Sequence, residues 1–312
     1  MQAQTRFALT GTPLENGVGE LWSIFNFVLP GYLLSYSAFL RRYQDGTDAE
    51  DLRRRISPFL MRRLKKEVLT ELPDKIESVF TAQMSPEQAK VYEATMMRLR
   101  QRVDSIVKEK GFERGRTEVL AAITQLREIC CHPSLVLDDY TGTSGKLDML
   151  LDMLPEAIAK GRRVLLFSAF TSMLKILRRE LEDAGYETMY LDGDTPAQRR
   201  VEMAEQFNAG QGQIFLISLK AGGTGLNLTG ADMVIHYDPW WNPAAEDQAT
   251  DRAYRIGQTR KVEVIRLVTH ASIEEQVVAL GQRKKALFDQ LIKPGESMVG
   301  GLSPQEIMSL FQ

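Results

Sequence analysis

Short apolar runs alternate with helical stretches between Lys146 and His270, and this rhythm constrains the fold more than any other feature of the chain. The runs are rich in β-branched and aromatic residues, and helical stretches or a glycine-rich loop separate them. Near-continuous apolar strands that alternate with helices are typical of a parallel sheet covered on both faces. The sequence therefore predicts an α/β fold of the nucleotide-binding sort, with strands within residues 162–170, 187–193, 212–219, 232–239 and 262–270.

Helical signals dominate on both sides of this region. A capping box over residues 85–88, with proline at the first helical position, predicts one long helix. Residues 117–133 predict a second helix that ends at its terminal proline, and residues 75–84 are compatible with a strand. Another capping box over residues 272–275 predicts a helix to about Ile292, and a short terminal helix is expected beyond it.

The composition limits the class of protein. A chain of 312 residues, 44% of them hydrophobic, can form one large or two medium domains, and its formal net charge of −2 indicates neither a basic nor an acidic partner. No apolar run is long enough to span a membrane, and residues 1–7 lack the apolar core of a signal peptide. Cys130 and Cys131 are adjacent, so a disulfide framework is not expected and a reducing, intracellular compartment is. With His132 they form a string too compact for a metal site.

Positive charge is concentrated in one place. Seven basic residues and no acidic residue lie between Leu52 and Lys66. Such a run either contacts phosphates or forms a solvated linker, and the sequence leaves both open.

Two arginines raise the question of function. An Asn-Pro start and a glycine stop predict a helix over residues 243–256, on which Gln248, Arg252 and Arg255 fall at i, i+4 and i+7 and share one face. Arginine binds phosphate through two directed hydrogen bonds, so this face suggests contact with the γ-phosphate of a nucleotide. The alternative is a solvated polar face paired with neighbouring acidic side chains.

A phosphate-binding loop would be expected to accompany such arginines. The nearest candidate is TGTSGKL (141–147), in which the glycines are too closely spaced and Leu147 replaces the serine or threonine that would hold magnesium. No acidic pair follows an apolar strand to bind the metal. We therefore expect this chain to lack both the phosphate loop and a metal site of its own.

Loops that follow the predicted strands carry small, polar and aromatic residues. Because sites in parallel sheets lie at the carboxyl ends of the strands, we expect these loops and the arginine helix to meet at one edge. They comprise Ser168, residues 192–195, the glycine-rich residues 220–227 and residues 239–241. Glycines let backbone amides approach a phosphate closely, and Lys220 adds positive charge.

Each loop has a structural alternative. The glycine-rich loop could be only a tight turn, and Thr195 is expected to cap a helix, although a cap amide can also hold a phosphate. Trp240 and Trp241 could be core residues. Two adjacent tryptophans between prolines are hard to bury together, so at least one is expected to face a groove.

Several strings together resemble the motifs of Swi/Snf-type translocases in helicase superfamily two, in the order that this family uses. The family consists of motors with two RecA-like lobes that close on ATP and move along duplex DNA. The resemblance covers nearly the whole chain and is most specific in the last two strings. The strings are LTGTPLEN (9–16) with ELWSIFNFVLPG (20–31), FLMRRLKKEVLTELPDK (59–75), VLLFSAF (164–170), YLDGDT (190–195), SLKAGGTGLNLTGADMVIHYDPWWNP (218–243) and DQATDRAYRIGQ (247–258).

The resemblance implies a role for individual residues. Arg252 and Arg255 would be catalytic arginine fingers that reach ATP on the other lobe, and Gln258 would support them. The implied ATP-binding residues are Gly223, Gly225, Gln248, Arg252, Arg255 and Gln258. The implied DNA-binding residues are Ser168, Gly193, Thr195, Lys220, Gly222, Gly223 and Trp241. Thr10 and Thr12 would couple the ATP site to movement.

The resemblance also implies an organisation in four parts. Residues 1–30 would be a remnant of the first lobe, 31–143 a helical linker and protrusion, 144–270 the RecA-like second lobe, and 271–312 bracing helices. In this family the first lobe carries the phosphate loop and binds most of the ATP and Mg²⁺. Its absence here predicts that this chain alone does not hydrolyse ATP.

The expected function is therefore that of the C-terminal motor half of an ATP-dependent double-stranded DNA translocase. The expected partners are duplex DNA, ATP and an upstream RecA-like lobe, with no membrane, and the expected location is inside the cell on DNA. The protein that such a motor would move stays open. A non-catalytic nucleic-acid-binding module is one alternative; a lobe of an RNA helicase is another, although the long helical insert and the paired tryptophans disfavour it.

Overall fold

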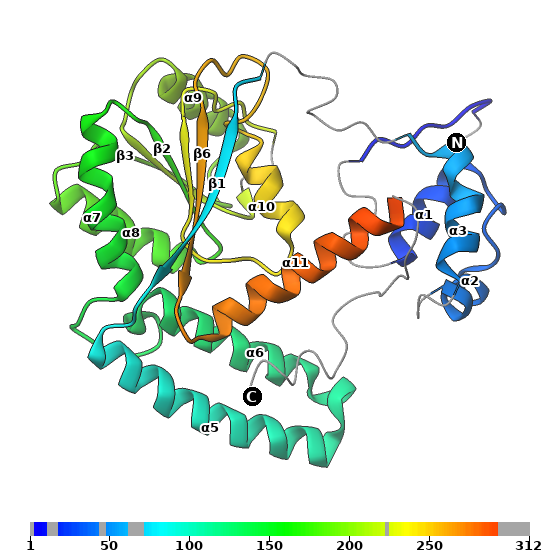
Figure 1. Cartoon of the computed structure of the whole chain (residues 1–312), viewed down its shortest axis with the longest axis horizontal. Coiled ribbons are helices and arrows are strands. Elements are labelled where there is room, and N and C mark those ends of the chain that lie inside the picture. The colour runs from blue at the N-terminus through cyan, green and yellow to red at the C-terminus, as the bar shows by residue number, and fades with distance from the viewer. Residues whose placement is uncertain (1–2, 11–17, 44–47, 62–71, 222–224, 293–312) are drawn as a thin grey trace. The chain divides into compact units, whose positions relative to one another are not determined.

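The computed structural model describes residues 3–10, 18–43, 48–61, 72–221 and 225–292. By their contacts, these residues form two compact units, a smaller one that contains helices α1 to α3 and a larger one that contains the sheet (Figure 1). Strand β1 and helices α5 and α6 belong to the same unit as the sheet. The four-part division expected from the sequence stays a prediction.

A six-stranded parallel sheet organises the larger unit, as the apolar runs predicted. Its strand order is β1-β6-β5-β2-β4-β3, and every pairing between neighbours is parallel. The strands are β1 (Lys75–Ala82), β2 (Val164–Ser168), β3 (Thr188–Leu191), β4 (Ile214–Ser218), β5 (Met233–His236) and β6 (Val262–Thr269). This confirms the α/β, RecA-like fold class.

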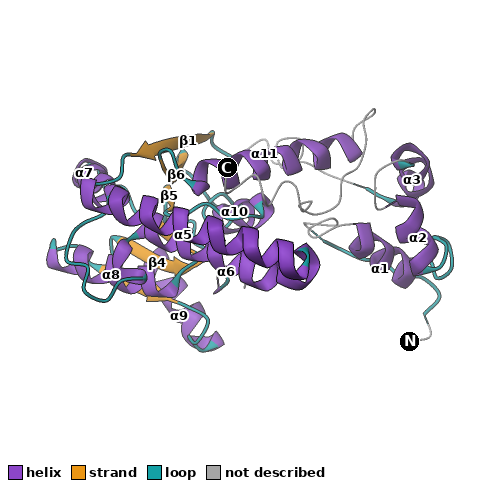
Figure 2. Ribbon diagram, turned by 90° about the horizontal axis from the view of Figure 1, so that it is seen from below, coloured by secondary structure: helices purple, strands orange, loops and turns teal. Residues whose placement is uncertain are grey.

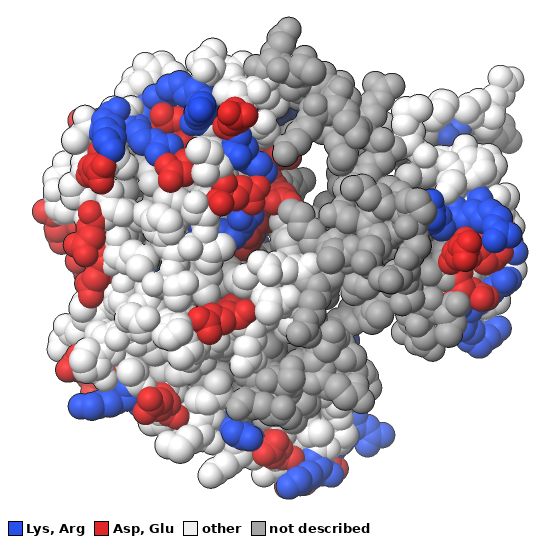
Figure 3. Space-filling model, viewed as in Figure 1, with Lys and Arg blue, Asp and Glu red and all other residues white. Residues whose placement is uncertain are grey.

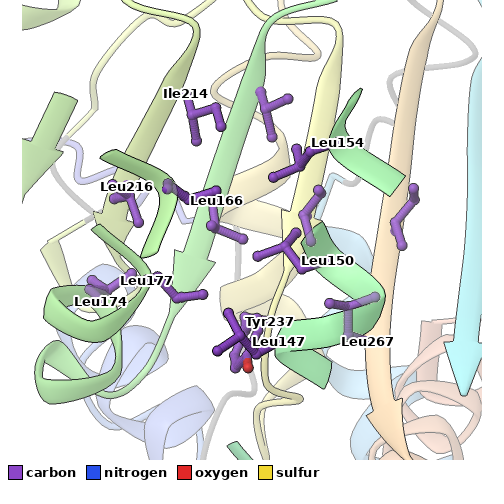
Figure 4. Packing of buried hydrophobic residues seen from close by; sticks show 14 of the residues in the cluster. Leu147, Leu150, Leu154, Leu166, Leu174, Leu177, Ile214, Leu216, Tyr237 and Leu267 are labelled. Atoms are coloured by element: carbon purple, nitrogen blue, oxygen red, sulfur yellow. The ribbon is translucent and has the colours of Figure 1, made fainter. Parts of the chain in front are cut away.

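Successive side chains of the central strands pack against helices on opposite faces of the sheet. Leu166 of β2 belongs to a core cluster with α7 (Gly145–Ala159) and α8 (Thr171–Asp183), whose leucines gather against the strands in Figure 4. Leu165 packs on the other face with α9 (Ala197–Asn208). Because both faces are covered, β2, β4 and β5 are buried at every position, which explains their continuous hydrophobicity.

Two long helices form a pair, α5 (Pro86–Lys110) and α6 (Phe112–Cys131), which lie side by side in Figures 1 and 2. The hydroxyl of Ser85 accepts the Gln88 N–H at 3.2 Å, so the predicted cap of α5 is confirmed. The Gln88 amide donates to the carbonyl of Ile129 and accepts the N–H of Gly145. This side chain therefore joins the start of α5 to the end of α6 and to α7.

The outer surface of α5 shows no excess of one charge in the view of Figure 3, where basic and acidic side chains lie intermixed over the helix.

A helix α11 (Ile273–Ile292) follows β6 from the predicted capping residue, since the Ser272 hydroxyl accepts the Glu274 N–H at 3.2 Å. No described helix is both long and apolar enough to cross a membrane. The short terminal helix expected beyond Ile292 lies outside the described residues.

The smaller unit is built on three short helices, α1 (Val18–Val28), α2 (Tyr36–Tyr43) and α3 (Ala49–Ile56), around a cluster that includes Phe39 and Leu52. Part of the basic run lies on α3, where Arg55 pairs with Asp51 at 2.9 Å. An acidic residue just upstream thus offsets part of the positive charge. The remaining basic residues, Arg62, Arg63, Lys65 and Lys66, lie outside the described residues.

Candidate functional site

The loops at the carboxyl edge of the sheet are connected through their backbones. The N–H of Leu219, after β4, donates to the carbonyl of Ser168 at 2.9 Å, and the N–H of Tyr237, after β5, donates to that of Phe167 at 2.9 Å. The N–H of Leu228 donates to the carbonyl of Arg252 at 2.9 Å. The structure therefore brings together the loops after β2, β4 and β5 at this edge. The arginine segment (residues 251–258) instead meets the loop after β4 where that loop returns to the start of β5, because Gln258 bonds to the carbonyls of Thr229 and Ala231 just before that strand. The prediction that the arginine helix lies at the carboxyl edge is therefore wrong.

The arginines do not share a helical face, contrary to the prediction from the sequence. Helix α10 (Pro243–Thr250) starts as expected but ends six residues early. Beyond Thr250 the chain turns more tightly, because the N–H groups of Arg252 and Ala253 bond to carbonyls three residues back. The carbonyl of Arg252 is taken by the loop after β4, so it cannot continue the helix. Gln248 and Arg255 are consequently exposed, whereas Arg252 is buried.

Arg252 carries a positive charge that its surroundings do not fully compensate. It is only 7% exposed, and its Nε has no hydrogen-bond partner among the residues that the structure describes. Burial lowers the pKa of Arg252 and the charge of Arg255 lowers it further, while Asp251 acts in the opposite direction. A buried donor without an acceptor costs free energy, so this guanidinium is suited to an anion arriving from outside the described chain.

Arg255 lies next to the glycine-rich loop. Its Nη1 donates to the carbonyl of Gly225 at 3.3 Å, a long hydrogen bond at an exposed side chain. Gly225 has a φ of +72°, a conformation that favours glycine. Gly222 and Gly223 lie outside the described residues, and Lys220 is exposed.

The buried side chain of Gln258 anchors the segment that carries Arg252 and Arg255. Its buried Nε2 lies within hydrogen-bond distance of the carbonyls of Thr229, Ala231 and Ala253, and its Oε1 accepts the N–H of Arg260. The carboxamide thus has no group left for a ligand. This arrangement fits the supporting role implied by the family resemblance, and the ATP contact of Gln258 stays a prediction.

Ser168 is buried, which limits what it can offer to DNA. Its hydroxyl donates to Asp238 and accepts the N–H of Phe170 at the start of α8. Asp238 also accepts from Arg127 of α6, with Nη2 and Oδ2 3.4 Å apart. Burial raises the pKa of the Asp238 carboxyl, and Arg127 opposes this rise. The hydroxyl of Ser168 is thus engaged within the fold, and its DNA contact stays a prediction.

The two tryptophans are half-buried, so neither is a fully buried core residue. The guanidinium of Arg127 lies 5.3 Å from the ring centroid of Trp240 and 5.4 Å from that of Trp241. The backbone N–H of Trp240 donates to the carboxylate of Glu246, on α10, at 2.7 Å. Sequence reasoning missed Arg127, which adjoins Glu128 and has no local signal that distinguishes it from a solvated arginine.

The loop after β3 follows the last strand of the sheet, on the opposite side from β1 in the strand order. Gly193 is exposed and Thr195 is half-buried. The prediction that Thr195 caps α9 is wrong, because the hydroxyl bonds to Asp192 and the residue before the helix is Pro196, which has no side-chain cap. Of the predicted coupling residues, Thr10 is described and exposed. Thr12 lies outside the described residues.

Family models match most of the chain. The SNF2-related domain matches residues 1–135, and the helicase conserved C-terminal domain matches residues 145–257. The chain belongs to the Swi/Snf family of helicase superfamily two. Arg252 and Arg255 lie within the second match, whereas Arg127 lies within the first. The resemblance inferred from the motifs is confirmed.

Relatives and solved structures agree with membership of the Swi/Snf family. A putative ATP-dependent helicase/translocase of Bacillus subtilis, YwqA, is 40% identical over 319 residues, which cover 97% of this chain and 34% of that protein. The chromatin structure-remodeling complex subunit snf21 of Schizosaccharomyces pombe is 36% identical over 93% of this chain and 27% of its own length. The chain thus spans about a third of the curated relatives it matches.

A solved structure resembles the Swi/Snf chain over nearly its full length. The SWI2/SNF2 ATPase core of Sulfolobus solfataricus in complex with double-stranded DNA is 36% identical, with a TM-score of 0.62, over 97% of this chain and 66% of that chain. Its C-terminal domain alone is 29% identical, with a TM-score of 0.59, over 76% of this chain and 98% of that one. These neighbours share the α/β fold described above.

Proposed function

We propose that this chain is the C-terminal motor half of an ATP-dependent double-stranded DNA translocase that acts inside the cell. Family membership supports the proposal, as do a relative named as an ATP-dependent helicase/translocase and a similar ATPase core solved with duplex DNA. The chain has no phosphate loop in its sequence, so the proposal includes a second RecA-like lobe that holds ATP and Mg²⁺.

The unpartnered, buried Nε of Arg252 is the observation that carries the nucleotide part of the proposal. An oxygen of a phosphate would supply the missing acceptor and the missing negative charge. Among the described residues, Arg255 makes a long hydrogen bond to the carbonyl of Gly225, and it can exchange this bond for a charge-assisted bond to phosphate. ATP would supply the reactive phosphoryl group, and both guanidinium groups would stabilise the charge on it during transfer.

The DNA part of the proposal rests on the carboxyl edge of the sheet. Lys220 is exposed, Trp241 keeps part of its ring accessible, and the loops after the strands offer backbone amides. Such groups bind the sugar-phosphate backbone and carry no sequence information directly. Binding is therefore expected to be independent of sequence and to weaken as salt rises.

The decisive experiment joins this chain in cis to a phosphate-loop lobe and measures ATP turnover stimulated by DNA. Arg252→Ala and Arg255→Ala should each lower turnover by at least about 10²-fold, because each removes a charge that stabilises the transferring phosphoryl group. Arg178→Ala is the matched control, since that side chain is half-exposed on α8, where it forms an ion pair with Glu182 at 2.8 Å and lies over the ring of Tyr190.

Two results would count against the proposal. Turnover that survives Arg252→Ala would remove the finger role, provided that the variant binds DNA as the parent does. A joined protein that binds DNA but shows no stimulated turnover at all would favour the non-catalytic nucleic-acid-binding alternative.

A further inference from the structure

Arg127 is a buried cation in an unusual position. It comes from α6, in the helical pair, yet its side chain is only 2% exposed beneath the loop that follows β5. Its Nη2 donates to the carbonyl of Pro239 at 2.6 Å and pairs with Asp238 at 3.4 Å. These two partners immediately precede the tryptophans in the chain, so Arg127 fixes the backbone from which both rings project.

Aromatic rings surround the same guanidinium. Its carbon lies 5.2 Å from the ring centroid of Phe170, 5.3 Å from that of Trp240 and 5.4 Å from that of Trp241. A cation within about 6 Å of an aromatic ring is attracted to its face, and more strongly when water is excluded. Arg127 therefore contacts the rings as well as the backbone of this loop.

The two tryptophans depend on Arg127 to different degrees. Trp240 has a second anchor, because its backbone N–H donates to the carboxylate of Glu246. Arg266 of β6 in turn donates to that carboxylate at 2.8 Å. The Trp240 ring also packs against the core cluster that contains Leu165. Among the described residues, the contact that defines the position of the Trp241 ring is the one with Arg127.

We propose that Arg127 is a positioning residue that sets the orientation in which Trp241 meets DNA. The inference rests on the proposed function, in which Trp241 contacts the DNA backbone. A contact with sugar or phosphate requires a ring held at one angle, and the guanidinium supplies that constraint from a helix outside the sheet. The helical pair thereby takes part in DNA contact through α6.

The test requires a variant that removes the guanidinium without leaving Asp238 unpaired. The double variant Arg127→Met with Asp238→Asn removes both charges of the buried pair, which proteins tolerate better than the loss of one. Arg127→Lys is the second variant: it keeps the charge and loses the forked geometry. Lys146→Met with Glu274→Gln is the matched control, because it removes another fully buried pair, 2.6 Å long, that contacts neither tryptophan ring.

The first measurement reports the position of the ring without DNA. The chain has three tryptophans, so Trp22→Phe and Trp240→Phe leave Trp241 as the only indole emitter. In this chain with both replacements, the Arg127 double variant should increase quenching of Trp241 by acrylamide and lower its anisotropy, with Arg127→Lys intermediate. The control pair should leave both values unchanged. Unchanged quenching in the Arg127 double variant would overturn the inference.

The second measurement reports function, as base pairs moved per ATP hydrolysed. With the natural tryptophans present, the Arg127 double variant should lower this ratio by about tenfold or more, in line with the loss of a desolvated cation–π contact. A normal ratio in this variant, alongside a low ratio for Trp241→Ala, would overturn the positioning role. A normal ratio for Trp241→Ala itself would instead show that the proposed DNA contact of Trp241 is wrong, whatever the fluorescence shows.

Discussion

Replacing Gln258 should both destabilise the larger unit and slow ATP turnover. In the folded chain its Nε2 lies 3.2, 2.7 and 3.1 Å from the carbonyl oxygens of Thr229, Ala231 and Ala253, and its Oε1 lies 2.9 Å from the N–H of Arg260. Gln258→Ala removes these partners from buried groups. The two N–H groups of Nε2 and the accepting Oε1 account for about three hydrogen bonds, so at about 1 kcal/mol each the free energy of unfolding should fall by about 3 kcal/mol.

Thermal unfolding and turnover are the two assays. A loss of this size should lower the melting temperature by about 6–12 °C in a unit of this size. Well below that temperature, DNA-stimulated turnover of the joined motor should still fall by roughly 10- to 10²-fold, because Arg252 and Arg255 are displaced from the transferring phosphoryl group. Gln258→Glu should be worse than Gln258→Ala in the melt, since a carboxylate would face carbonyl oxygens.

The control for this prediction is Gln198→Ala on α9. The amide of Gln198 is exposed, and its Nε2 donates to Glu202 at 3.3 Å. This variant should have the melting temperature and the DNA-stimulated ATP turnover of the parent. A Gln258→Ala protein that does the same would refute the reasoning, because it would show that the buried carboxamide does not hold the arginine segment.

Two further predictions concern charged pairs of the larger unit. Partial burial favours the neutral form of Glu77, but hydrogen bonds from Lys75 and Arg266 outweigh it and lower the pKa from 4.5 to about 2. The resulting stability is present above pH 4.5 and is lost as the pH falls toward 2, so Glu77→Gln should flatten the acid limb of a stability–pH curve; an identical limb would contradict this. Lys146→Met leaves Glu274 buried without its cation and should cost about 3–5 kcal/mol in urea unfolding, whereas adding Glu274→Gln should restore most of that loss. Equal loss in the single and double variants would argue against it.

The sequence was informative where structure depends on neighbours in the chain. The apolar runs gave the positions of the strands in the sheet from β2 onward, because a strand buried on both faces needs hydrophobic side chains at consecutive positions. The cap at Ser85 and the stop at Pro133 were readable because each acts within one helical turn. The order of motifs likewise identified the family, since it is a property of the sequence itself.

The site was harder to predict, because its geometry depends on partners that are distant in the chain. The Asn-Pro start and the glycine stop favoured one helix over residues 243–256, yet the carbonyl of Arg252 bonds to Leu228 and the helix ends at Thr250. That single long-range hydrogen bond separates a buried Arg252 from an exposed Arg255.

Arg127 shows the same limit most clearly. Its pairing with Asp238 joins residues 111 positions apart, and no local pattern in α6 distinguishes it from a solvated arginine. The sequence by itself determined the sheet, the helix caps at Ser85 and Ser272 and the family, because those follow from periodicity and from contacts within a few residues. Only the tertiary structure decided which charges are buried and what they touch, because the environment of a side chain is set by the elements that pack around it.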